Sequence, residues 1–221
     1  AFLRRAVFRP SDATDGEDLF DALARILTTQ VSTDEGLSEI LGPGQTVANF
    51  AAHLRGAGST PAYPIATALG QLTLQGRQTG RVLEYEKAGL VLVVDQLEEL
   101  FTNDRLTADD RVRFIDLLAA LVRSGAIWVI ATMRKDFWHR ADETPELIRL
   151  AEGGGRLELL APTPAQLGQM IRRPAEAAGL SFEVHDTTGA ALNEVIAQEV
   201  AREPGALPLR SYVIDQVYGS D

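Results

Sequence analysis

Three acidic residues follow a long apolar run in the middle of the chain. The run covers residues 88–94 (AGLVLVV), and Asp95, Glu98 and Glu99 come directly after it. Such a run is typical of a parallel strand buried on both faces, and open α/β sheets bind ligands beyond the carboxyl ends of their strands. Carboxylates at that edge suit Mg²⁺, which keeps most of its water ligands and takes only one or two carboxylates. The alternative is a solvated helix start, because acidic side chains also favour the first turn of a helix.

Two further candidate residues lie downstream of these acids. Arg134 follows a second apolar run, residues 126–132 (AIWVIAT), where a cation would lie beside the terminal phosphate of a bound nucleotide. An ion pair with a nearby acid at the sheet edge is the other interpretation of Arg134. Pro208 stands in the segment 204–209 (PGALPL), which opens a predicted helix. Proline is also common at the first position of a helix for structural reasons alone.

A sheet must position these side chains, and the spacing of apolar residues predicts one. Strand-forming runs predict strands at 4–9, 88–94, 126–132 and 156–160. Helical spacing predicts helices at 17–28, 36–41, 46–54, 65–74 and 109–123, separated by glycine and proline, including Gly76. The strand at 126–132 is predicted to be buried, and Val122 to face inward from the helix at 109–123. The alternation of strand and helix indicates an α/β fold with a parallel sheet.

The pattern becomes helical after residue 161. Thr163 is a predicted N-cap, with Pro164 at the first helical position and Gln166 closing a capping box. We expect this helix to break or kink at Pro174, because proline cannot donate the intrahelical hydrogen bond. Further helices are predicted at 187–202 and 207–218, with one weak strand signal at 182–184. The chain therefore divides into an α/β portion, 1–160, and a small helical portion, 161–221.

The order and wording of these motifs resemble the STAND ATPases, and in detail the novel STAND NTPase family of bacteria. The matching segments are VVDQLEELF at 93–101, ATMRKDF at 131–137 and PGALPL at 204–209, and the likeness runs from Val7 to Tyr218. Related groups are the NACHT and AP-ATPase modules. The resemblance implies a parallel P-loop NTPase-type (ASCE) sheet with helices, followed by a helical lid domain.

The same resemblance implies roles for the candidate residues. Asp95 would be the Walker B acid that contacts Mg²⁺ through water, and Glu98 or Glu99 would polarise the hydrolytic water. Arg134 would be sensor 1, and Pro208 would contact the nucleotide base from the lid. The implied function is an ATP/ADP-controlled conformational switch in bacterial signalling, in which ATP binding closes the lid and the protein oligomerises. Its implied partners are ATP or ADP, other copies of itself, and attached effector and sensor domains, all in the cytoplasm.

The sequence departs from the family pattern in one respect. A phosphate-binding Walker A loop needs G-x-x-x-x-G-K-[ST], yet Lys87 follows Glu86 and Lys135 follows Arg134, so no Gly-Lys pair exists here. We expect this loop and its strand to lie upstream of Ala1, and the missing strand to leave a gap beside the strand that precedes Arg134. The chain is then a fragment that neither holds Mg-ATP tightly nor hydrolyses ATP alone. The alternative is a nucleotide-free interaction or oligomerisation module derived from an ATPase fold.

The composition argues against nucleic-acid binding, against metal sites built from Cys and His, and against a membrane span. The net charge is −10, which argues against direct nucleic-acid binding, because phosphate contacts need clustered Lys and Arg. The chain has no cysteine and only 3 histidines, so it offers almost no Cys or His side chains that could bind a metal as a group. An apolar run of about 18 residues, long enough to span a membrane, is absent from the sequence.

Overall fold

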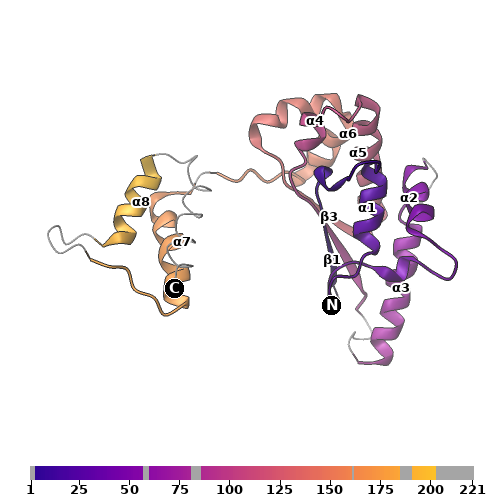
Figure 1. Ribbon diagram of the computed structural model, residues 1–221, viewed down its shortest axis with the longest axis horizontal. Helices are drawn as coiled ribbons and strands as arrows, with labels where there is room; N and C mark the ends of the chain where they lie inside the picture. The colour runs from indigo at the N-terminus through magenta and orange to yellow at the C-terminus, as the bar shows by residue number, and fades with distance from the viewer. Residues whose placement is uncertain (1–2, 57–59, 81–85, 161, 185–190, 203–221) are drawn as a thin grey trace. The chain divides into compact units, whose positions relative to one another are not determined.

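The computed structural model describes residues 3–56, 60–80, 86–160, 162–184 and 191–202, and Figure 1 shows the arrangement of its elements. The chain divides into two compact units, Ala1–Leu157 and Glu158–Asp221, whereas the sequence analysis places the boundary after residue 160. The first unit holds β1 (Leu3–Phe8), α1 (Leu19–Thr28), α2 (Val47–Arg55), α3 (Tyr63–Gln78), β2 (Gly89–Val94), α4 (Glu99–Thr102), α5 (Ala108–Arg123), β3 (Ile127–Ala131) and α6 (Pro145–Ala151). The second unit holds α7 (Pro164–Ala177) and α8 (Leu192–Arg202).

The three strands form one parallel sheet in the order β1-β2-β3. Ala6 of β1 lies opposite Leu92 of β2, and Leu92 lies opposite Val129 of β3. The helices between these strands make the crossovers that parallel pairing requires. The predicted α/β class with a parallel sheet is confirmed.

One face of the sheet is covered by helices and carries the core. Phe8 at the end of β1 contacts Phe114 of α5, with ring centroids 5.3 Å apart, and Phe20 of α1 meets the same ring edge-on at 6.1 Å. Leu90, Leu92 and Val94 of β2 are fully buried on this face. The helices α1 and α2 pack side by side on the covered side (Figure 1).

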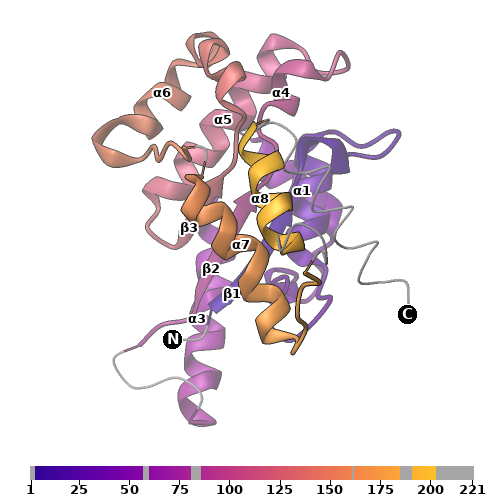
Figure 2. The ribbon, with the colours of Figure 1, turned by 90° about the vertical axis from the view of Figure 1, so that its left-hand side faces the viewer.

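The other face of the sheet is mostly apolar, with Arg5 of β1 among its side chains, and the described helices of the first unit leave it exposed. Its exposed side chains come from the two outer strands, β1 and β3. On the central strand, β2, Val91 and Val93 are half-buried. The exposed fractions are 51% for Leu3, 52% for Val7, 71% for Trp128 and 55% for Ile130. The prediction that β2 and β3 are buried on both faces is therefore wrong for β3 and only half right for β2. Figure 2 shows the sheet turned by 90° from the view of Figure 1.

Local end signals explain the helix boundaries in the first unit. Asp18 caps α1 and Thr107 caps α5, each closing a capping box with the acid three residues on. The segment predicted as a helix at 36–41 forms only a 3₁₀ turn, Ser38–Ile40. The helix α3 passes through Gly76, because one glycine costs a helix only about 1 kcal/mol. Val122 is exposed rather than inward, since the buried stripe of α5 runs through Phe114, Ile115, Leu118 and Leu121.

The second unit keeps its predicted N-terminal signal. The Thr163 side chain accepts from the Gln166 amide, and the Gln166 side chain closes the capping box. Pro174 lies inside α7, so the helix does not break there; of the predicted break or kink, the break is wrong. Met170, four residues earlier, is exposed, so water can satisfy the carbonyl that proline leaves unbonded. The helix predicted at 207–218 lies outside the described residues.

The segment 156–160 forms no strand, which corrects a further prediction. Leu157, Leu159 and Leu160 are exposed, and a strand requires a neighbouring strand to take its hydrogen bonds. The weak signal at 182–184 gives only an isolated bridge between Val184 and Ala191. In the described part of the chain, no helix is long and apolar enough to cross a membrane.

Candidate functional site

The carboxyl ends of the three strands bring one polar side chain each to a common row. Arg9 follows β1, Asp95 follows β2 and Thr132 follows β3. Arg9 Nε donates to Asp95 Oδ2 at 2.9 Å, Arg9 Nη2 lies 2.8 Å from the same oxygen in an ion pair, and the Thr132 hydroxyl donates to Asp95 Oδ1 at 2.7 Å. Both oxygens of the Asp95 carboxylate are therefore held by neighbouring strands.

This row keeps Asp95 ionised. The Thr132 hydroxyl first, and the Arg9 guanidinium second, lower the pKa of Asp95 below its ordinary value, because both groups stabilise the carboxylate. The turn after β2 fixes the same geometry: Gln96 adopts a positive φ of 57°, and its amide donates to the Thr132 hydroxyl at 3.0 Å. The acid predicted as Walker B is thus fixed and charged at the ligand edge of the sheet.

Glu98 and Glu99 are adjacent in sequence but are held by different loops. Glu98 is buried, and its Oε2 accepts a hydrogen bond from the Arg134 amide at 3.2 Å. Glu99 Oε2 accepts from the Ser11 amide at 2.8 Å. Glu98 therefore belongs to the β3 side of the motif and Glu99 to the β1 side, a distinction that the sequence left open.

Arg134 reaches the site through its backbone, while its side chain pairs within its own loop. The guanidinium donates to Asp136 Oδ2 at 2.6 Å and to Asp136 Oδ1 at 3.2 Å, and lies 5.3 Å from the Phe137 ring centroid. The Arg134 side chain is 65% exposed, so this ion pair is screened by water and weak. The ion-pair interpretation of Arg134 thus describes this structure. Pro208 lies outside the described residues.

The donor set fits a metal that brings most of its own ligands. No group of three or more His, Asp or Glu side chains in the described residues could hold a metal ion. Asp95 offers one ionised, partly exposed carboxylate, which matches Mg²⁺ bound mainly by water and phosphate oxygens. A permanent all-protein metal site does not fit these residues.

Two residues of the row were missed by the sequence analysis. Thr132 was read only as the end of an apolar run, and Arg9 only as part of a strand end before Pro10. The signal that could have found them is positional. A polar residue that directly follows a parallel strand lies at the same edge as the polar residues that follow its neighbours.

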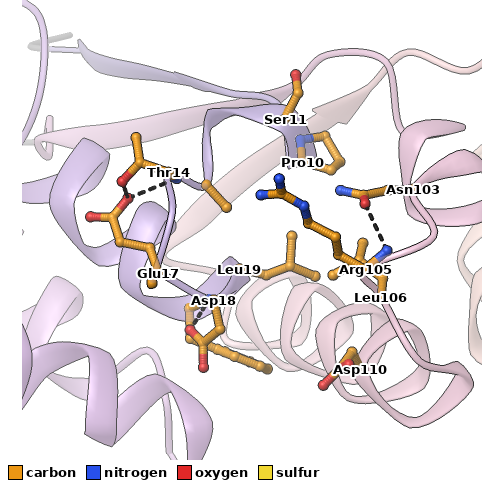
Figure 3. Close-up of a pocket in the computed structure, with 13 residues that line it drawn as sticks. Pro10, Ser11, Thr14, Glu17, Asp18, Leu19, Asn103, Arg105, Leu106 and Asp110 are labelled. Atoms are coloured by element: carbon orange, nitrogen blue, oxygen red, sulfur yellow. Dashed lines mark hydrogen bonds between the residues drawn. The ribbon is translucent and has the colours of Figure 1, made fainter.

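A cavity of about 340 Å³ opens on the β1 side of this edge, and its lining includes none of Asp95, Glu98 or Arg134. Figure 3 shows Asn103 and Arg105, from the loop after α4, facing Thr14 and Glu17 across it.

The charges around this cavity are matched within the chain. Arg105 Nη1 donates to Asp15 at 2.8 Å, and Glu17 binds both Arg25 and Thr14. The Arg25 hydrogen bond is the main reason why the pKa of Glu17 falls to about 2. We assign these ion pairs to the scaffold that joins two loops.

The family comparison agrees with the motifs on which the site rests. A family model described as Novel STAND NTPase 1 matches residues 5–221, which includes β2, β3, the larger part of β1 and every candidate site residue. No curated protein and no solved structure matches the chain. The parallel sheet, the acid-rich turn after β2 and the match over nearly the whole length agree with one another. The chain belongs to the novel STAND NTPase 1 family.

Proposed function

We propose that this chain is the Walker B, sensor and lid portion of an ATP-hydrolysing signalling switch. The supporting observation is the ionised Asp95 at the carboxyl end of β2, with Glu98 tied to the loop of Arg134. In this proposal Asp95 faces Mg²⁺ through water, Glu98 or Glu99 polarises the attacking water, and Arg134 senses the terminal phosphate. Pro208 contacts the base from the lid.

Bound Mg-ATP would supply an activated terminal phosphoryl group for transfer to water. The position of each residue in this chain then determines its proposed role. Asp95, held by Thr132, presents a fixed negative charge to the water shell of the cation. Glu98 accepts from the Arg134 amide, so the acid that would orient water and the arginine that would sense phosphate shift together. This contact makes Glu98 the stronger candidate of the two glutamates.

The isolated chain is proposed to lack tight ATP binding. It has no Gly-Lys pair to hold phosphates, and among the described residues β3 has no strand partner on the edge away from β2. We propose that a strand and phosphate-binding loop of a longer protein complete the site there. Calorimetric titration of this chain with Mg-ATP tests the point: the expected result is no saturable heat, and micromolar affinity would contradict it.

The switch itself is tested by comparing ATP and ADP affinities in the longer protein. Arg134→Ala should weaken ATP by about 1.5–3 kcal/mol and ADP much less, because a charge-assisted contact to the terminal phosphate exists only with ATP. Pro208→Ala should weaken both nucleotides alike, because both carry the base. Arg149→Ala is the matched control, since Arg149 is also an exposed arginine paired with an acid of its own segment.

An unchanged ATP/ADP ratio in Arg134→Ala would remove the sensor role. It would favour the second candidate, a nucleotide-free interaction or oligomerisation module. The observation that favours this candidate is the open apolar face of the sheet, where Trp128 and Ile130 are exposed. Under the switch proposal, the same surface would bind another copy of the protein or an attached domain.

A further inference from the structure

Arg9 is the least expected member of the row at the strand ends. It lies 86 residues from Asp95 in sequence, yet its guanidinium places two nitrogens on one oxygen, Asp95 Oδ2. The Arg9 side chain is 49% exposed and that of Asp95 is 28% exposed, so the pair lies at the surface of the edge where a ligand would approach. Thr132 holds the other oxygen, Oδ1.

The lone pairs of the carboxylate limit what else can bind there. A carboxylate offers about four acceptor positions, two on each oxygen. Arg9 Nε takes one position on Oδ2, its Nη2 lies 2.8 Å from the same oxygen, and Thr132 takes one position on Oδ1. A hydrated divalent cation needs this negative charge and these positions, because its water ligands donate to the carboxylate. The guanidinium and the hydrated cation therefore compete for the Asp95 carboxylate.

We propose that Arg9 is a positioning residue that holds Asp95 while no cation is present and that competes with a divalent cation for its Oδ2 atom. This inference rests on the proposed function, in which Asp95 faces Mg²⁺. Arg9 acts through Asp95 and not on the substrate. Because the pair is partly exposed, its guanidinium can turn into water when the cation arrives, and the carboxylate stays in place on Thr132.

A purely structural role makes a different prediction. If the pair only ties β1 to β2, its loss lowers stability and leaves cation affinity unchanged. Partly exposed ion pairs contribute little to stability, about 0–1 kcal/mol. Cation affinity is therefore the more sensitive property, and it does not require turnover.

The test uses Mn²⁺ as the probe and the present chain as the protein. Mn²⁺ binding is measured by the water-proton relaxation of titrated samples, for the wild type, Arg9→Gln, Asp95→Asn and the double variant. Arg9→Gln should bind Mn²⁺ about two- to fivefold more tightly, as expected when an ion pair of this exposure no longer competes. The gain should vanish in the double variant, because it is exerted through Asp95.

Arg5→Gln is the matched control for charge and for folding. Arg5 lies on β1, four residues before Arg9, and also pairs with an acid, Glu35, but away from Asp95. It should leave Mn²⁺ affinity unchanged. Equal affinity in Arg9→Gln and the wild type, or a gain that survives in the double variant, overturns the proposal for Arg9. If Asp95→Asn changes Mn²⁺ affinity in neither background, the competition proposed for Arg9 fails, whereas the role proposed for Asp95 with Mg-ATP is tested separately by nucleotide affinity in the longer protein.

Discussion

The two faces of the sheet carry similar side chains in opposite surroundings. Alternate residues of β1 and β2 pack under α1 and α5, where Phe8, Leu90 and Leu92 are fully buried. The residues between them, with Trp128 and Ile130 of β3, form a second, largely apolar surface that also carries Arg5 and that the described residues of the first unit leave exposed. Both faces read alike in sequence, because the period of two only assigns residues to opposite sides.

The comparison teaches that apolar character and burial are separate properties here. Contiguous exposed apolar surface on a folded unit marks a place for another element or protein. The covered face should therefore carry the stability of this chain, and the open face its associations. The carboxyl edge of the sheet, where Asp95 and Thr132 lie, borders both faces. Each of these regions gives a prediction.

The largest effect is expected from truncating the covered face. Leu92→Ala should lower the free energy of unfolding by about 2–5 kcal/mol, because it leaves a cavity in a closed core. Leu3→Ala removes the same atoms from the same sheet on the open face, and should cost within about 0.5 kcal/mol. Urea denaturation of the two variants measures the difference, and equal losses would show that the open face is not open in solution.

A smaller effect is expected from polar substitution on the open face. Trp128→Ser with Ile130→Ser should weaken the proposed self-association by about 1.5–3 kcal/mol, roughly the value of burying one large apolar side chain, while stability changes little. Sedimentation velocity over a range of concentrations measures the shift towards monomer. Val31→Ser with Leu74→Ser replaces two other exposed apolar residues and serves as the control. The same shift in the control would mean that general hydrophobicity, and not this face, drives association.

The smallest effect is expected at the edge. Thr132→Val removes the donor to Asp95 and should raise the pKa of Asp95 towards its ordinary value. Because that pKa is depressed in the folded state, the stabilisation by Asp95 is present above its unfolded pKa and is lost as the pH falls through the folded pKa. The variant should thus lose about 1 kcal/mol near pH 7, and its difference from the wild type should shrink in acid.

Carboxyl-carbon NMR titration of Asp95 and denaturation at several pH values measure both parts of this prediction. Thr132→Ser keeps the hydroxyl and should behave like the wild type. A pKa of Asp95 that is unchanged in Thr132→Val would contradict the hydrogen bond between the two side chains.

The sequence by itself determined the local elements and the family. The apolar runs located β1, β2 and β3 to within one or two residues, and the Thr163–Gln166 capping box located the start of α7. Such signals are local, because a strand or a cap is written in a few consecutive residues. The order of the acids after β2 and the arginine after β3 was enough to indicate the novel STAND NTPase family, which the family comparison confirmed.

Only the tertiary structure decided which of these residues meet and which faces are covered. Arg9 and Asp95 come together because two strands far apart in sequence are neighbours in the sheet. Glu98 and Glu99 are indistinguishable in the sequence, and their roles separate only through contacts with Arg134 and Ser11. The segment 156–160 reads as a strand but forms none, because strand formation depends on hydrogen bonds from a neighbour that its own residues cannot supply.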